Sequence, residues 1–100
     1  MVKTKECIIS EIGGYIKKCG GVNFTWYVGI TNDAEERLFS DHNVDKDSGY
    51  WCWRTAASAD IAREIEKYFL GLNLDGGPGG GDDDSNNVYV YKKTNYTRER

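Results

Sequence analysis

The most reactive side chains of this sequence are few, and their spacing limits what they can bind. The three cysteines, Cys7, Cys19 and Cys52, are odd in number and form no Cys-x-x-Cys pair. Such a pattern argues against a disulfide framework and against a zinc site. We therefore predict reduced, partly buried thiols.

A glycine- and aspartate-rich run over residues 75–87 is a second candidate. Its three consecutive aspartates, Asp82, Asp83 and Asp84, could bind Ca²⁺, but their spacing does not match an EF-hand, and a solvated acidic loop is the commoner outcome. The glycines before them lack the Lys-Ser/Thr pair of a phosphate-binding P-loop. The run has too little apolar surface to fold by itself, so we predict a connecting loop.

Clustered aromatic residues offer a third kind of chemistry. Tyr50, Trp51 and Trp53 could form a platform for stacking bases, because aromatic rings present faces on which any base can stack. Packing in a hydrophobic core is the commoner fate of such rings. An exposed face beside Arg54 and Arg37 would favour the binding interpretation.

Four polar side chains in the middle of the sequence can carry charge or transfer protons: Tyr27, Arg37, His42 and Glu66. Each has an ordinary structural alternative. These alternatives are core packing for the tyrosine, an ion pair with Asp33 or Asp41 for the arginine, a helix C-terminal cap for the histidine, and a solvated helix surface for the glutamate. Their meaning depends on the elements that carry them.

Hydrophobic periodicity predicts three helices. Apolar residues recur at three- and four-residue intervals over residues 5–19, although Gly13 and Gly14 weaken that helix by about 1 kcal/mol each relative to Ala, and a hairpin arm through residues 14–16 is the alternative. A short helix over residues 33–42 follows Thr31-Asn32-Asp33 and buries Leu38. Ser58 can cap a third helix, whose apolar stripe comprises Ile61, Ala62, Ile65, Phe69 and Leu72.

Three segments rich in β-branched and aromatic residues predict strands over residues 24–30, 50–55 and 88–91. In the second strand, Trp51, Trp53 and Thr55 share one face, and Tyr50, Cys52 and Arg54 share the other. The charged end after the third strand is predicted to be a frayed tail. The expected fold is a single α+β domain over residues 1–100, with a small three-stranded, mainly antiparallel sheet flanked by about three helices.

The composition restricts the class of protein. A net charge of -3 counts against strong nonspecific binding to nucleic acid. No run approaches the ~20 apolar residues of a membrane span, and the N-terminus lacks the apolar stretch of a signal peptide. We therefore expect a cytoplasmic protein with no membrane partner.

Within this framework, the segment Trp26-Tyr27-Val28-Gly29-Ile30-Thr31-Asn32 resembles the Tyr-Ile-Gly half of the GIY-YIG nuclease signature. The resemblance continues through Arg37-Leu38 and His42 to Glu66 and covers roughly residues 26–70. In that family a strand tyrosine, a helix arginine, a further His or Tyr, and a glutamate on a later helix gather on one face of a three-stranded sheet. Tyr27, Arg37, His42 and Glu66 match in type and order.

The resemblance implies a metal-dependent endonuclease that cleaves phosphodiester bonds of DNA. By this resemblance Glu66 would hold one Mg²⁺ or Mn²⁺ ion, with Glu64 as the less favoured alternative, and Arg37 would neutralise phosphate oxygens. Tyr27 or His42 would transfer a proton or position water. The competing function is an inactive module on the same scaffold that binds a protein or nucleic acid. A nuclease domain of this size would also need a partner protein or a homodimer for recognition.

The first half of the signature is not found in its usual place. No Gly-Ile-Tyr strand precedes Trp26 at short spacing, so the first tyrosine of the family must come from elsewhere. One alternative is a degenerate strand at Gly14-Tyr15-Ile16. The preferred alternative is that residues 88–92 take the place of the first strand from the other end of the chain, with Tyr91 or Tyr89 as the substitute.

Overall fold

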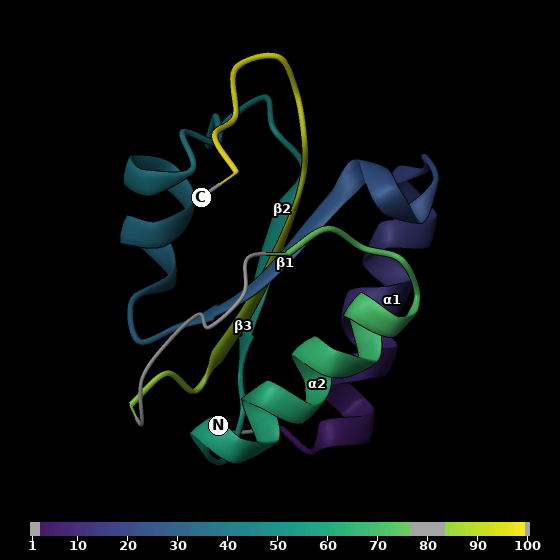
Figure 1. The fold of residues 1–100 in the computed structure, drawn as a ribbon, viewed down its shortest axis with the longest axis vertical. Coiled ribbons are helices and arrows are strands. Elements are labelled where there is room, and N and C mark those ends of the chain that lie inside the picture. The colour runs from purple at the N-terminus through teal and green to yellow at the C-terminus, as the bar shows by residue number, and fades with distance from the viewer. Residues whose placement is uncertain (1–2, 77–83, 100) are drawn as a thin grey trace.

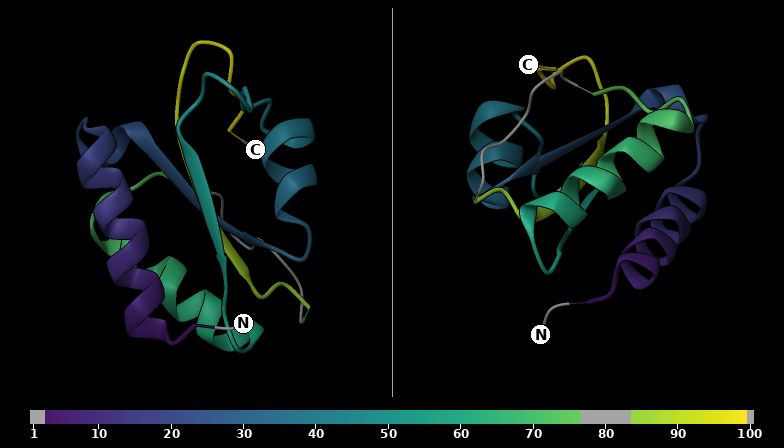
Figure 2. Two further views of the ribbon diagram at one scale, coloured as in Figure 1. Left: turned by 180° about the vertical axis from the view of Figure 1, so that it is seen from behind. Right: turned by 60° about the horizontal axis from the view of Figure 1, so that its bottom comes forward.

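The computed structural model describes residues 3–76 and 84–99. One three-stranded sheet lies between two layers (Figure 1). The helices α1 (Lys5–Cys19) and α2 (Ala59–Gly71) cover one face, and the short helix η2 (Glu36–Asp41) lies on the other beside the C-terminal segment. Figure 2 shows the same layering from behind. The predicted α+β class, with a small antiparallel sheet and about three helices, is confirmed.

The sheet has the order β1-β3-β2, so its last strand along the chain is central. Both neighbours, β1 (Trp26–Thr31) and β2 (Trp51–Thr55), pair antiparallel with β3 (Asn87–Lys92). The three predicted strands are present with ends shifted by one or two residues. A 3₁₀ turn, η1 (Asn23–Thr25), occupies the predicted start of the first strand.

Helix α1 has the predicted bounds. The Thr4 hydroxyl accepts a hydrogen bond from the Cys7 amide at its start, and Gly20, with φ of 83°, ends it in a conformation that favours glycine. The alternative of a strand or hairpin arm at Gly14-Tyr15-Ile16 is wrong, because these residues are helical. The Tyr15 hydroxyl instead accepts a hydrogen bond from the Trp51 amide at 2.8 Å.

Helix α2 begins at the predicted cap, where the Ser58 hydroxyl accepts from the Ile61 amide at 3.2 Å. Its buried stripe comprises Ala62, Ile65 and Phe69. Leu72 was predicted to extend that stripe, but it lies beyond the last helical turn and is 41% exposed. The apolar face therefore ends one turn earlier than the sequence pattern predicts.

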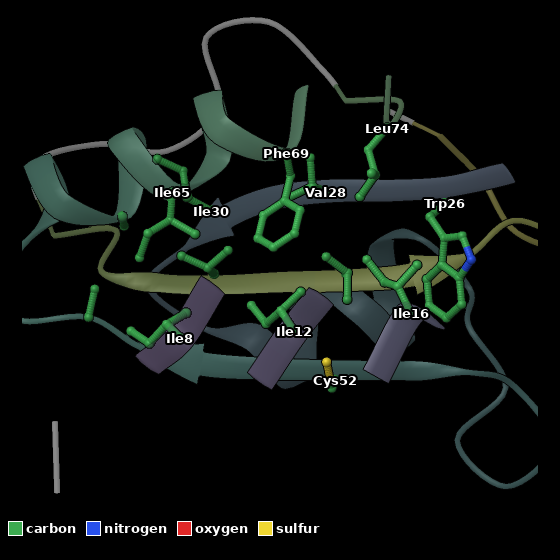
Figure 3. Close-up of a cluster of buried hydrophobic side chains, with 14 residues drawn as sticks. Ile8, Ile12, Ile16, Trp26, Val28, Ile30, Cys52, Ile65, Phe69 and Leu74 are labelled. Atoms are coloured by element: carbon green, nitrogen blue, oxygen red, sulfur yellow. The ribbon is translucent and has the colours of Figure 1, made fainter. Parts of the chain in front are cut away.

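The main hydrophobic core lies between the two long helices and the sheet. Figure 3 shows Ile8, Ile12 and Ile16 of α1 and Ile65 and Phe69 of α2 directed at the same face of the sheet, with Phe69 beside Val28 of β1. The strand residues that alternate with these core residues point to the opposite face. There a second cluster forms from Tyr27, Leu38, Val44, Tyr89 and Tyr91. The alternation of the strands thus separates an aliphatic face from a face rich in tyrosine.

The predicted helix over residues 33–42 is present at residues 34–41. Its larger, C-terminal part, η2 (Glu36–Asp41), is a π-helix. An Asp33 carboxylate oxygen accepts from the Glu36 amide at 3.1 Å at the start of this helix, and Leu38 is buried as predicted. The His42 amide donates to the Arg37 carbonyl at 2.9 Å, a spacing of five residues. Such turns are rare and often occur at functional sites.

The chain after β3 differs from the predicted frayed tail. Residues 93–99 fold back over the tyrosine-rich face, where the Arg98 amide donates to the His42 carbonyl at 2.7 Å. The Asn43 side-chain amide donates to the Tyr96 carbonyl at 2.9 Å. These contacts order a segment whose composition alone suggested fraying.

The predicted loop over residues 75–87 is only partly described. Asp75 forms an isolated parallel bridge to Tyr27, and Asn87 already belongs to β3. Residues 77–83, which include Asp82 and Asp83 of the proposed acidic loop, lie outside the described residues. Over residues 3–76 and 84–99, the structure contains no helix of the length and hydrophobicity that a membrane crossing requires.

Candidate functional site

Four rings converge on the tyrosine-rich face of the sheet. Tyr27 comes from β1, Tyr89 and Tyr91 from β3, and His42 from the end of η2. The ring centroid of His42 lies 4.8 Å from those of Tyr27 and Tyr91 and 5.5 Å from that of Tyr89. The cross-strand register, which pairs Tyr27 with Tyr91, sets the positions of two of these rings.

His42 is the hydrogen-bonding centre of this group. Its Nε2 atom lies 2.8 Å from the Tyr89 hydroxyl. Its Nδ1 atom lies 2.5 Å from the Arg98 carbonyl oxygen and 3.0 Å from the Tyr91 hydroxyl. The Tyr91 hydroxyl also donates to the Glu99 carboxylate at 3.0 Å. A fully buried imidazole is thus enclosed by two phenols and the C-terminal segment.

Gly29 explains how the Tyr89 side chain lies across β1. Gly29 and Tyr89 are cross-strand partners, and a Cβ atom on Gly29 would be 2.4 Å from the Tyr89 hydroxyl oxygen. The phenol therefore lies directly over the Gly29 backbone. The glycine of the Tyr-Val-Gly segment is needed for space rather than for an unusual backbone angle.

Arg37 lies at the rim of the ring cluster. Its guanidinium donates to the Asp41 carboxylate at 3.0 Å, so the ion pair expected as its structural alternative is present. Burial lowers the pKa of Arg37, but the hydrogen bonds to Asp41 and Tyr89 outweigh it and raise the pKa. The arginine also lines a hollow of about 240 Å³ with Thr31, Asn32 and Asp33. Glu36 and Asp41 line it as well, so among the described residues that line this hollow the guanidinium is the one positively charged group beside three acidic side chains.

Glu66 lies on α2, the helix that covers the opposite face of the sheet from η2. Its Oε2 atom is buried and has no hydrogen-bond partner among the described residues. Burial raises the pKa of Glu66, and the charge of Glu66 in turn contributes to raising the pKa of Tyr89. Glu64, the alternative ligand, is exposed and accepts from the Lys5 ammonium at 2.9 Å. Of the two glutamates, only Glu66 is poorly satisfied.

The electrostatic environment keeps the cluster neutral. Burial lowers the pKa of His42 and the charge of Arg37 adds to this, which outweighs the opposite effect of the hydrogen bond to the Arg98 carbonyl and of the charges of Glu99 and Asp41. Burial raises the pKa of Tyr89 and of Tyr91, and the neighbouring Glu99 raises that of Tyr91 further. At neutral pH the imidazole is therefore uncharged and both phenols keep their protons.

The donor set suits a divalent ion held by one carboxylate. No group of three or more His, Cys, Asp or Glu side chains with metal-binding geometry occurs in the part of the chain that the structure describes. Mg²⁺ keeps several waters and often takes only one or two carboxylates. An unsatisfied buried carboxylate such as Glu66 is also a group that a cation would stabilise. The residues present therefore fit such an ion.

The predicted stacking platform is largely engaged in packing. Trp51 and Trp53 are half-buried on the tyrosine-rich face, as the alternation predicts, and Cys52 lies on the other face. The Trp51 indole donates to the Lys46 carbonyl at 3.1 Å and meets Phe39 edge to face. Tyr50 precedes β2 and is exposed near the Lys92 ammonium.

The structure brings Tyr27, His42, Tyr89 and Tyr91 together, with Arg37 at the rim, and gives Glu66 an electrostatic influence on Tyr89. Sequence reasoning missed Glu99 and the Arg98 carbonyl. No pattern in the charged tail identifies them, since their role depends on how the segment folds back. A comparison of the chain with known protein families, characterised proteins and solved structures finds no match.

Proposed function

We propose that this protein is a metal-dependent endonuclease of GIY-YIG type that hydrolyses phosphodiester bonds of DNA. The observation that carries the proposal is the convergence of three phenols on one buried, neutral histidine, with a guanidinium at the rim and an α2 carboxylate oxygen that has no partner among the described residues and whose charge acts on Tyr89. Hydrolysis of a phosphodiester needs a proton acceptor, positive charge near the phosphate and stabilisation of the leaving oxygen. The cluster contains a candidate for each need.

The central position of β3 supports the resemblance to that family. The preferred alternative for the missing first strand requires residues 88–92 to lie beside the Tyr-Val-Gly strand. The observed register pairs Tyr91 with Tyr27 and Tyr89 with Gly29. Strand pairing depends on spatial register and not on chain order, so a strand from the other end of the chain can supply the tyrosine. Both candidates, Tyr89 and Tyr91, point to the face that carries His42.

Arg37 is the proposed phosphate contact. Its guanidinium borders the hollow beside Asn32 and Asp33, and its pKa is raised, so it stays charged. The ion pair with Asp41 is half-exposed and contributes little, on the order of 0.5 kcal/mol. A phosphate can therefore compete for the guanidinium. Its two parallel N–H groups suit a phosphate better than a lysine ammonium does.

Glu66 is the proposed ligand of one Mg²⁺ or Mn²⁺ ion. Its Oε2 atom is available for coordination because no described residue bonds to it. When bound, the ion would stabilise negative charge on the leaving oxygen. Glu64, two residues earlier, serves as an internal comparison because it is exposed and already paired with Lys5.

The test is cleavage of labelled single- and double-stranded DNA with and without Mg²⁺ or Mn²⁺. We expect metal-dependent cleavage that Glu66→Gln and Arg37→Ala abolish and Glu64→Gln leaves unchanged. The fold of each variant is checked by far-UV circular dichroism. Equal residual cleavage in all variants would indicate a contaminating nuclease and contradict the proposal.

A noncatalytic binding module is the second candidate function. It is favoured by the half-buried Trp51 and Trp53, which lie on the same face as the tyrosines. DNA or peptide binding that does not depend on metal, together with no cleavage, would support this function instead. Loss of that binding in Trp53→Ala but not in Glu66→Gln would locate the contact on β2.

A further inference from the structure

We propose that the C-terminal segment 96–99 is a positioning element of the site, which fixes the tautomer of His42 and so makes Tyr89 the phenol that donates to it. The inference rests on the proposed function for its catalytic meaning, but not for its structural content. It also distinguishes Tyr89 from Tyr91, which the sequence does not.

The Arg98 carbonyl determines which nitrogen of His42 carries the hydrogen. A carbonyl oxygen can only accept, and it lies 2.5 Å from Nδ1. If Nδ1 carried a lone pair, two lone pairs would face each other at this distance. The hydrogen must therefore be on Nδ1, and it is donated to Arg98.

The other nitrogen follows from the neutrality of the ring. His42 is fully buried, and its burial together with the positive charge of Arg37 outweighs the Arg98 carbonyl, Glu99 and Asp41, which favour an imidazolium. A neutral ring with hydrogen on Nδ1 has a lone pair on Nε2. The Tyr89 hydroxyl, 2.8 Å away, must then donate to Nε2.

Tyr91 is excluded from this role by the same geometry. Its hydroxyl is 3.0 Å from Nδ1, which already carries a hydrogen and cannot accept. Its own proton goes to the Glu99 carboxylate at 3.0 Å. Glu99 thus takes the Tyr91 proton, so Tyr91 does not donate to Nδ1 of His42.

The segment is held in place by contacts that do not involve the imidazole. The Arg98 amide donates to the His42 carbonyl at 2.7 Å, and the Asn43 side chain donates to the Tyr96 carbonyl at 2.9 Å. The Arg98 main chain therefore contacts His42 twice: its amide bonds to the His42 backbone, and its carbonyl bonds to the His42 side chain. This double contact fixes the orientation of the ring relative to the sheet.

The tautomer defines a path for one proton. As a water oxygen forms its bond to phosphorus, the water proton passes to the Tyr89 oxygen and the Tyr89 proton passes to Nε2 of His42. The phosphorus–oxygen bond to the leaving group breaks, and the leaving oxygen takes a proton from solvent. His42 becomes an imidazolium whose Nδ1 hydrogen stays hydrogen-bonded to the Arg98 carbonyl, and the extra proton then returns from Nε2 through Tyr89 to solvent. Tyr89 is neutral before and after the step.

The test uses the fact that His42 is the single histidine of the sequence. In ¹⁵N-labelled full-length protein, long-range ¹H–¹⁵N correlations of the imidazole report which nitrogen is protonated. Free imidazole side chains in water favour the form with hydrogen on Nε2. We expect the opposite form, with hydrogen on Nδ1, at neutral pH. Hydrogen on Nε2, or on both nitrogens, would overturn the proposal.

Two variants identify the cause of that tautomer. Truncation after Thr97 removes the Arg98 carbonyl, and we expect the Nε2–H form to become the major one. The matched control is Arg98→Ala, which keeps the carbonyl and should keep the hydrogen on Nδ1. An unchanged tautomer in the folded truncated chain would show that the segment does not set it. If the truncated chain does not fold, the wild-type spectrum alone still decides the assignment.

Cleavage assays separate this inference from the proposed function. If the hydrogen is on Nδ1 and truncation moves it, but the protein does not cleave DNA, then the positioning role stands and the proposed nuclease function is wrong. If the protein cleaves DNA but the hydrogen is on Nε2, then the nuclease function stands and the positioning role is wrong. If the wild type cleaves DNA, the loss of cleavage rate in Tyr89→Phe should be at least tenfold larger than the loss in Tyr91→Phe.

Discussion

The Tyr89 hydroxyl lies over the α-carbon of Gly29, closer than any side chain on that residue would allow. A Cβ atom there would be 2.4 Å from the hydroxyl oxygen and 2.5 Å from the ring carbon that bears it. Tyr89 cannot move away cheaply, because it is buried and bonded to His42. The two residues form one unit in which the small residue of β1 makes room for the phenol of β3.

Gly29→Ala should therefore destabilise the fold by about 1–3 kcal/mol, the usual range for overpacking a buried site. The measurement is the urea unfolding midpoint. Gly14→Ala is the matched control, because nothing lies within 4 Å of a Cβ at that exposed helical position. It should stabilise by about 1 kcal/mol through helix propensity alone. Equal effects of both changes would contradict the packing described here.

The two strand tyrosines should respond differently to loss of the hydroxyl. Tyr89→Phe removes the donor to Nε2 of His42, so kcat should fall about 10²–10⁴-fold if the protein is the proposed nuclease. Tyr91→Phe removes only the bond to Glu99 and a contact at Nδ1. We expect a loss of less than about tenfold from Tyr91→Phe, since a general acid–base step is not removed. A larger loss from Tyr91→Phe would reverse the assignment.

The lowered pKa of His42 predicts a pH dependence of stability. The folded pKa lies below the unfolded value near 6.5, so the unfolded chain binds the proton first as the pH falls. Stability is then fully present above pH 6.5 and declines from there down through the folded pKa. The raised pKa of Glu66 has the opposite effect, because the folded protein takes up that proton first.

Urea midpoints between about pH 7.5 and 5.5 measure this dependence, and the Glu66→Gln background removes the opposing contribution. In that background the urea midpoint should decrease as the pH is lowered from about 7.5 to 5.5. The further substitution His42→Gln should remove this dependence of the midpoint on pH. A level profile with His42 present would mean that burial does not lower its pKa.

Glu66 should show a conflict between stability and metal binding. One oxygen of its half-buried carboxylate has no hydrogen-bond partner among the described residues, so Glu66→Gln should stabilise the metal-free protein by about 1 kcal/mol by removing a poorly solvated charge. Millimolar Mg²⁺ should raise the melting temperature of the wild type and of Glu64→Gln, but not of Glu66→Gln. A shift that survives in Glu66→Gln would place the ion elsewhere.

The local patterns of the sequence predict much of the fold. Period-3.6 stripes, with the cap at Ser58 for the second, give both long helices, and the alternation of residues 88–91 gives a strand with Tyr89 and Tyr91 on one face. These features depend on interactions between neighbours along the chain. Leu72 was misassigned because its spacing continued a stripe after the helix itself had ended.

The missed features depend on contacts between distant segments. The spacing of Glu99 and His42 along the chain carries no signal, since only the return of the C-terminal segment brings the Arg98 carbonyl to the imidazole. The role of Gly29 was also hidden, because the conflict is with a side chain of another strand and not with its own backbone. Sequence reasoning thus identified candidate groups but not the atoms that orient them.

The central position of β3 has a consequence for the order in which the protein is made. The outer strands β1 and β2 share no pairing with each other, and each is joined to the sheet only by β3. On the ribosome, β1 and β2 therefore leave the exit tunnel before the strand that unites them exists. The helices can form as they emerge, but the sheet and the ring cluster around His42 must wait for residues 87–92. Folding of this domain is thereby delayed until residues 87–92 have emerged, when the sheet can form and cover the apolar faces of α1 and α2 together.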